Sequence, residues 1–235
     1  MKIIKDFFVV ALILITVSAC EGFGYSKNSR TGSGNVITKE VNIQPFSKIE
    51  INGIIDVILE QGVKESARIE TDDNLMSLID VRTEGSTLFI ALKKDSSIRK
   101  STKLNVFVTL VNITHLTLNG VGDLETNGIL ELNDLYIETT GVGDIKLAID
   151  CTSLSVDNSS VGDISLFGKT RSLKVNNSGV GDIYAYELTT DYAFIKNSGV
   201  GDVEVNVMES IEIESSGVGD VEYTGNPTVN SGKIQ

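Results

Sequence analysis

Six aspartates recur at a nearly constant spacing and have the clearest potential for metal chemistry in the chain. Each closes the tetrapeptide Gly-Val-Gly-Asp, or Ser-Val-Gly-Asp in one copy, and successive aspartates are 18 to 21 residues apart. The six are Asp123, Asp144, Asp163, Asp182, Asp202 and Asp220. Carboxylate oxygens suit a hard cation, so a row of weak Ca²⁺ sites is one interpretation. In the other interpretation, each carboxylate lies at the surface of a turn and accepts a backbone N–H of its own corner.

Few other side chains suggest catalysis. His115 is the only histidine, there is no tryptophan, and Cys151 is one of two cysteines. A nucleophilic Cys151 would need a base, and His115 lies more than one repeat upstream, so we interpret Cys151 as a small buried hydrophobe. A lyase needs a basic residue beside a neutralised carboxylate, and a glycosidase needs paired acids in a cleft. Since the lysines and arginines of the repeats occur singly, no catalytic set is predicted.

Two tyrosines are the candidates for contact with a ligand. Tyr184 and Tyr186 follow Ile183 in one repeat. In an extended strand they lie on the opposite face from Ile183 if that residue is buried. They would then form an exposed patch that could bind a protein partner or a glycan.

The elements that hold these residues follow from the flanks of the tetrapeptide. An apolar residue lies four positions before each copy and another directly after each aspartate, as Val175 and Ile183 do around one copy. Each unit therefore reads as a strand, a corner and a second strand. Such a short unit cannot bury its own apolar face, but units stacked in register can. The sequence predicts an all-β fold, a right-handed parallel β-helix or β-solenoid with about six coils of 18–21 residues.

The middle glycine of each tetrapeptide is predicted to form the corner, because glycine adopts a positive φ without strain. These corner glycines are Gly122, Gly143, Gly162, Gly181, Gly201 and Gly219. The valine before each glycine and the apolar residue after each aspartate are three positions apart, so they face opposite sides of an extended strand. Both can be buried only if the chain bends between them.

Residues 1–19 have the features of a bacterial lipoprotein signal peptide. Two lysines precede an apolar run, Phe7 to Val17, that is too short to span a membrane and ends at Val-Ser-Ala-Cys. We expect cleavage before Cys20 and acylation of Cys20, with palmitate among the attached chains, which would anchor the protein in a membrane. A plain secretory signal followed by a chance cysteine is the alternative. Residues 20–35, rich in glycine, serine and asparagine, predict a flexible tether.

Residues 36–111 lack the tetrapeptide but alternate apolar and polar residues in short stretches separated by turn signals. They are predicted to form an irregular N-terminal β region with one helical turn between Asp73 and Ile79. The repeat solenoid is assigned to residues 112–235. Val229 to Ile234 is interpreted as a seventh corner that has lost its Val-Gly-Asp and caps the end.

A resemblance to a known family rests on Phe46 to Leu92, which contains SKIEINGIIDVILEQG, IETDDNLMSLIDVRTEG and LFIAL, and on the repeated SGVGD that follows. These segments resemble the putative auto-transporter adhesin, head GIN domain family, found in lipoproteins of Bacteroidetes-type bacteria. The resemblance covers nearly the whole chain after the signal peptide. It implies a β-helix-like fold on an envelope protein and an adhesin role, and it transfers no catalytic residues.

Charge and composition narrow the function further. A net charge of −12 argues against nucleic acid and against anionic lipid head groups as ligands of the folded body. The favoured function is a binding or adhesin-like module of the cell envelope, anchored through Cys20 in the outer membrane, with a glycan or protein as ligand. A structural envelope scaffold without an external ligand is the alternative, and a carbohydrate-active β-helix enzyme is favoured least. The sequence does not distinguish a location on the cell surface from one facing the periplasm. A homo-oligomer is compatible with each function. No cofactor other than Ca²⁺ is considered.

Overall fold

The structure is a computed structural model that describes residues 29–232. The predicted signal peptide, Cys20 and the first part of the predicted tether lie outside the described residues, as do residues 233–235. The described chain consists of β-strands joined by turns and loops, with one 3₁₀ turn, η1 (Met76–Leu78), inside the stretch for which a helical turn was predicted. Over residues 29–232 we find no helix that is both long and apolar enough to cross a membrane.

The strands fall into two groups along the chain. The first group is β1 (Ser29–Thr31), β2 (Val36–Val41), β3 (Lys48–Asn52), β4 (Asp56–Gln61), β5 (Ser66–Asp72), β6 (Ile79–Glu84), β7 (Thr87–Leu92), β8 (Ser97–Lys100) and β9 (Leu104–Leu110). The second group is β10 (His115–Leu118), β11 (Leu124–Thr126), β12 (Leu130–Glu131), β13 (Asp134–Thr139), β14 (Ile145–Asn158), β15 (Ile164–Asn177), β16 (Ile183–Asn197), β17 (Val203–Ser215), β18 (Val221–Gly225) and β19 (Thr228–Gly232).

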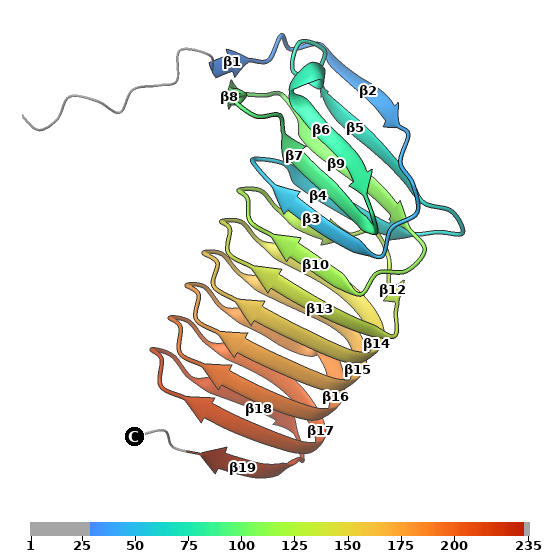
Figure 1. Ribbon diagram of the computed structural model, residues 1–235. Coiled ribbons are helices and arrows are strands. Elements are labelled where there is room, and N and C mark those ends of the chain that lie inside the picture. Colours follow the sequence, from blue (N-terminus) through green and yellow to red (C-terminus); the bar gives the residue numbers. More distant parts are fainter. Residues whose placement is uncertain (1–28, 233–235) are drawn as a thin grey trace, which may run out of the picture.

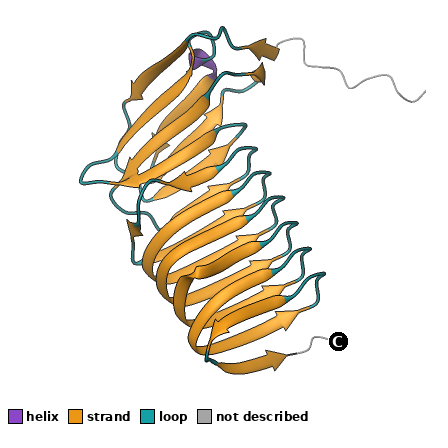
Figure 2. Ribbon diagram, turned by 180° about the vertical axis from the view of Figure 1, so that it is seen from behind, coloured by secondary structure: helices purple, strands orange, loops and turns teal. Residues whose placement is uncertain are grey.

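The second group, together with β3 and β4 of the first, builds a flattened parallel β-solenoid with two sheets (Figures 1 and 2). The front sheet of Figure 1 contains β3, β10, β13, the second halves of β14 to β17, and β19. The back sheet contains β4, β11, the first halves of β14 to β17, and β18. Each long strand leaves a corner in the back sheet, bends near its middle and reaches the next corner in the front sheet. The coil is right-handed, as predicted (Figure 1).

Equivalent side chains stack between the two sheets and form the core. In the regular coils the front sheet contributes Leu116, Ile137, Val156, Val175 and Ile195, and the back sheet contributes Leu124, Ile145, Ile164, Ile183 and Val203. All ten are at most 3% exposed. They are the apolar positions that flank the tetrapeptide, because alternate residues of each strand point inward and stacking covers them from both sides.

The solenoid begins well before the predicted boundary at residue 112. β3 pairs in parallel with β10, and β4 pairs in parallel with β11, so these two strands form a complete coil. Its corner reads Gly53-Ile54-Ile55-Asp56, and Ile54 pairs with Val121 as each later valine pairs with the next. The predicted division into residues 36–111 and 112–235 is therefore corrected. The tetrapeptide pattern did not include this coil because Ile55 replaces the corner glycine.

The strands before and after this first coil cap the rod. β7 pairs in parallel with β3 and β9 with β4, which extends each sheet by one strand. Antiparallel strands then finish this end, with β6 beside β7, β5 beside β9, and β2 beside β5 (Figure 1). The N-terminal β region is thus the upper end of the same rod.

Residues 29–35, which were predicted to belong to a flexible tether, are held against the folded body. β1 pairs in parallel with β8, and the chain that follows is held by Asp72, which is fully buried. The Asp72 carboxylate accepts the backbone N–H of Gly34 at 2.7 Å and the N–H and hydroxyl of Thr102 at 2.7 and 2.9 Å. These donors, the Thr102 N–H most of all, lower the pKa of Asp72. Local composition could not indicate this contact because the partners are far apart in sequence.

The lower end of the rod is formed by β18 and β19, and each pairs with β17. Val229 lies inside β19, opposite Ile211, so the prediction of a seventh corner there was wrong. Ser231 and Gly232 match Ile213 and Glu214 in register, which places them before the corner position. The Asn-Ser-Gly sequence resembled a corner, but strand register decides its position.

Candidate functional site

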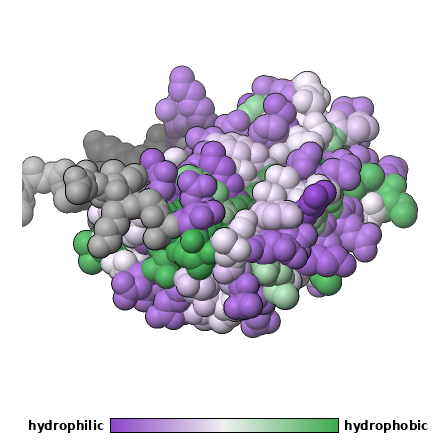
Figure 3. All heavy atoms as spheres, turned by 90° about the horizontal axis from the view of Figure 1, so that it is seen from below, coloured by the Kyte–Doolittle hydropathy of each residue, from purple (hydrophilic) through white to green (hydrophobic). Residues whose placement is uncertain are grey.

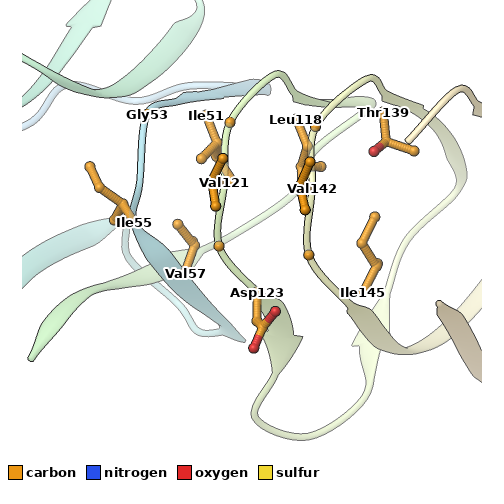
Figure 4. A pocket seen from close by; sticks show the side chains of 14 residues that line it. Ile51, Gly53, Ile55, Val57, Leu118, Val121, Asp123, Thr139, Val142 and Ile145 are labelled. Carbon is orange, nitrogen blue, oxygen red and sulfur yellow. The ribbon is translucent and has the colours of Figure 1, made fainter. Parts of the chain in front are cut away.

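The corner edge of the rod depends on the middle glycine of the tetrapeptide. The six corner glycines have φ values from 126° to 143°. A Cβ on Gly181 would lie 2.3 Å from the carbonyl oxygen of Gly162 in the preceding coil, and the other corners meet their neighbours in the same way. Figure 4 shows two such corners, at Val121 and Val142, side by side. The cavity between them has a volume of only about 10 Å³, so this interior site cannot hold a ligand larger than water.

The aspartates connect successive coils. Asp123 Oδ1 accepts the backbone N–H of Asp144 at 2.9 Å, and each later pair repeats this bond at 2.8 to 2.9 Å. The prediction that each carboxylate binds its own corner was wrong, because stacking directs the N–H of the next coil toward it. Asp56 makes the same bond to Asp123 and is a seventh member that sequence reasoning missed. An aspartate three residues after Gly53 and directly before apolar Val57 was the available signal.

The aspartate row does not converge on a metal site in the described chain. Between residues 29 and 232, no group of three or more His, Cys, Asp or Glu side chains is placed to hold a metal ion. Each bonded aspartate of the row uses Oδ1 for a backbone N–H. Asp182 also accepts the Tyr184 hydroxyl, and together with the Asp202 N–H this lowers the pKa of Asp182. The Ca²⁺ interpretation stays a prediction that this geometry does not favour.

The valines of the tetrapeptide lie outside the core and form an apolar ridge along the corner edge. They pair one with the next as single parallel bridges. Their exposed fractions are Val121 51%, Val142 50%, Val161 50%, Val180 49%, Val200 49% and Val218 69%. The residue after each aspartate is buried up to Val203. The valine and the residue after the aspartate therefore do lie on opposite sides of the strand, and it is the valine that is left outside the core.

A polar groove with a volume of about 470 Å³ lies in the front sheet beside the corner edge. This volume falls within the range of small-molecule sites. It crosses several successive coils, and two rows of side chains line it. One row consists of the hydroxyls of Thr140, Ser159, Ser178 and Ser198, and the other of Glu138, Asp157, Asn176 and Lys196. Sequence reasoning missed this groove, although the small polar residue before every tetrapeptide was the signal for its hydroxyl row.

The strand segments that form the floor of the groove are tied together on their inner side by a ladder of buried asparagines. Asn158 Nδ2 donates to Asn177 Oδ1 at 2.8 Å, Asn177 Nδ2 donates to Asn197 Oδ1 at 3.0 Å, and Asn197 Nδ2 donates to the Gly201 carbonyl at 3.2 Å. All three asparagines are at most 1% exposed. Since each amide donates to the next member of the ladder or to the backbone, the floor has a fixed geometry.

The side chains above this floor are also held in place. The hydroxyls of Ser159 and Ser178 are 2.9 Å apart, and Ser178 donates to the Asn158 carbonyl at 3.1 Å. Asp157 accepts the Tyr136 hydroxyl at 2.7 Å, and this bond with burial raises the pKa of Tyr136 to about 12. The groove therefore presents polar groups in defined orientations, with an aromatic ring beside them.

Tyr184 and Tyr186 lie on the back sheet, on the other side of the rod from the groove. Ile183 and Ala185 are buried, so the tyrosines point outward, and Tyr184 is 38% exposed. The Tyr184 hydroxyl donates to Asp182 at 2.8 Å and the Tyr186 hydroxyl donates to Glu222 at 3.0 Å. The bond to Asp182 raises the pKa of Tyr184 to about 12, and burial together with the bond to Glu222 raises the pKa of Tyr186 to about 12. The predicted patch exists as a surface, but carboxylates already occupy its hydroxyls.

His115 and Cys151 have separate partners. His115 Nδ1 lies 2.9 Å from the Thr114 hydroxyl, and the ring packs edge-on against Tyr136 at 5.8 Å. Cys151 is partly buried at the bend between sheets, where its thiol lies 3.4 Å from the Thr170 hydroxyl. Burial raises the pKa of the Cys151 thiol, which disfavours the nucleophilic thiolate.

A rod of stacked parallel coils with a repeating polar flank defines a β-solenoid protein. The chain belongs to the putative auto-transporter adhesin, head GIN domain family, whose model matches residues 45–227. This match starts just before β3 and includes the first coil, in agreement with a single continuous rod.

Solved structures with the same fold include proteins from Bacteroides and Parabacteroides species. A putative adhesin from Bacteroides fragilis NCTC 9343 is 30% identical, with a TM-score of 0.82, over 86% of this chain and 94% of that one. A putative lipid binding protein from Parabacteroides distasonis ATCC 8503 is 21% identical, with a TM-score of 0.69, over 86% and 95% of the two chains. A putative adhesin from Parabacteroides merdae ATCC 43184 is 21% identical, with a TM-score of 0.66, over 87% and 95%. A search of the curated proteins found no match.

Neither the family description nor these three structures bears the name of an enzyme. An adhesin-type family is typical of the cell surface or envelope.

Proposed function

We propose that the protein is a lipid-anchored binding module of the cell envelope that holds a neutral glycan in the polar groove of the front sheet. The observation that carries this proposal is the row of fixed hydroxyl, amide and carboxylate groups that lines a groove of about 470 Å³. The proposed anchor is acylated Cys20.

The chemistry of the groove suits a sugar. Glycans expose many hydroxyls that act as both donors and acceptors, and the groove offers acceptors from Asp157 and Glu138, a donor from Lys196 and mixed groups from its serines. Because hydrogen bonds already hold Asp157, Ser159 and Ser178 in place, little side-chain entropy is lost on binding. The Tyr136 ring beside Asp157 supplies apolar contact of the kind that aromatic residues give to ligands.

The repeat also suits an extended ligand. The hydroxyl row advances by one strand spacing per coil, about 4.8 Å, so a linear glycan could bind several equivalent positions in succession. The charges in the groove favour a neutral glycan. It contains two carboxylates, Glu138 and Asp157, and one amine, Lys196, whose Nζ lies 3.5 Å from a carboxylate oxygen of Glu214. Acidic polysaccharides would be repelled.

The groove is tested by removing its hydroxyls. The variant Thr140→Val/Ser159→Ala/Ser178→Ala is expected to bind a neutral glycan identified on an array at least about tenfold more weakly, because each lost hydrogen bond contributes about 0.5–1.5 kcal/mol. Titration calorimetry measures the affinity, and thermal unfolding checks that the variant is folded. The matched control, Tyr184→Ser/Tyr186→Ser on the back sheet, is expected to bind like the parent protein.

Equal binding by the triple variant, or loss of binding in the tyrosine control, would move recognition away from the groove. If no neutral glycan binds the intact protein, the structural scaffold becomes the better hypothesis.

For the anchor, Cys20→Ser is expected to move the protein from the membrane pellet to the soluble fraction. Protease treatment of intact cells then distinguishes surface exposure from a periplasmic location.

A further inference from the structure

The lower end of the rod leaves apolar side chains in solvent. Tyr223 and Val229 are 42% and 41% exposed, although they align in register with Val205 and Ile211, which are fully buried one coil earlier. Val221 is half-exposed at the position where Val203 is fully buried. Figure 3 views the molecule from this end and shows a hydrophobic area surrounded by polar side chains.

The two last strands at this end also pair on one side only. β18 and β19 each pair with β17 on their inner side, and Figure 1 shows no described strand beyond them. An exposed strand edge is a template for pairing with another strand. The upper end differs, since the antiparallel strands β2, β5 and β6 cover it. The two ends of one rod are therefore built differently.

We propose that two copies of the chain join through these open ends, tail to tail about a two-fold axis, so that both sheets continue across the junction in antiparallel pairs. A partner must supply two strand edges with the same separation and opposite directions as β18 and β19. A second copy has the same two strand edges, and a two-fold axis reverses their directions. The same surface is then used on both copies, so the assembly stops at a dimer.

Charge agrees with this pairing. If β18 pairs with the same strand of the second copy around Tyr223, Glu222 lies opposite Thr224 of the partner subunit and not opposite another glutamate. β19 contains no charged residue in Thr228–Gly232. The junction would thus bury Tyr223 and Val229 from both copies without placing like charges directly across from each other.

The position of the junction has a consequence for membranes, which rests on the proposed anchor. The first described residue, Ser29, lies at the capped end, and β19 lies at the other end (Figure 1). In a tail-to-tail dimer the two lipid anchors would point away from each other. Such a dimer bridges two membranes and gives a homotypic form of adhesion.

The test uses the full chain with Cys20→Ser, studied by sedimentation equilibrium over a wide concentration range. The chain is expected to form a reversible dimer. Thr224→Lys places a cation opposite Glu222 of the partner subunit and should tighten the dimer, whereas Thr224→Glu should weaken it. Each change is expected to be roughly threefold to tenfold in Kd, since the cross-strand pair occurs twice. Thr152→Lys and Thr152→Glu, in the exposed bend between the sheets, are the matched controls and should leave the Kd unchanged.

A monomer at every concentration overturns the proposal. A dimer that responds equally to Thr224→Lys and Thr224→Glu, or to neither, uses another surface and overturns it as well. Glycan binding by the groove is measured separately on the same protein, so failure of the dimer and failure of the proposed function give different results.

Discussion

A single buried carboxylate, Asp72, joins three segments that are distant in sequence. It accepts bonds from the Gly34 and Thr102 backbones, so it fixes the segment before β2 to the loop before β9. An unpaired carboxylate in the same position would be strongly unfavourable, which makes these donors essential to the cap.

Replacing Asp72 tests this contact and its pH dependence. Asp72→Asn loses one acceptor and directs an amide toward N–H donors, so a lower melting temperature is expected at pH 7. The folded-state pKa of Asp72 is lowered, so its contribution is present above the unfolded value of about 3.9 and is lost as the pH falls through the folded value. The difference from the parent protein should therefore shrink below about pH 4. Thermal unfolding from pH 7 to pH 2 measures it, with exposed Asp95→Asn as a control that should show no such trend.

The corner glycines give a second prediction at the scale of residues. Gly181→Ala is expected to destabilise the fold by about 2–4 kcal/mol, because the new Cβ meets a backbone carbonyl and the φ of 131° is strained. Gly85→Ala is the control, since Gly85 also has a positive φ but no atom within 4 Å of the new Cβ, and should cost only about 1 kcal/mol. Denaturant unfolding measures both. Equal losses in the two variants would mean that the coil contact adds nothing.

The asparagine ladder acts as an element that spans three strands. Asn177→Val is expected to cost about 2–4 kcal/mol, because it leaves the amides of Asn158 and Gly179 without their acceptor. In the upper coils the same row contains Ile51 and Leu118, so aliphatic residues fit there. Replacing Asn158, Asn177 and Asn197 together by valine should therefore cost less than the sum of three single losses. Chemical denaturation of all four variants checks this, and strict additivity would contradict it.

Sequence patterns predicted the repeating elements in detail and the N-terminal strands only as an irregular β region without their pairing. Val175 and Ile183 alternate with polar residues, and this local period defines strands, core and corner glycines. The first coil was missed because Ile55 stands where later coils have glycine, and only pairing with Val121 identifies it. The Asp72 contacts and the groove join residues from several coils, so they exist only after stacking. Tyr184 was placed on the correct face, but its bond to Asp182 was not predicted.

At the scale of the whole molecule, the coils are interchangeable units. Deleting residues 164–182 joins Asp163 to Ile183, which reproduces the native Asp-Ile junction and keeps every strand in register. This variant is expected to fold as a shorter rod with a modestly lower melting temperature, because a solenoid contributes stability coil by coil. Deleting residues 164–173 breaks the register and should prevent cooperative folding. Circular dichroism and small-angle scattering distinguish the outcomes, and equal behaviour of the two deletions would contradict the repeat model.

The difference between the two ends of the rod also has a consequence for the order in which the parts of the chain fold. The capped end lies in the first half of the chain, so during synthesis it emerges first and can close its antiparallel strands around a finished seed. Each later coil then needs only the one before it as a template, and the tip that grows last is the one left uncovered. Folding of this protein should therefore advance in one direction, and damage to the seed should cost far more folding yield than the same damage near the tip.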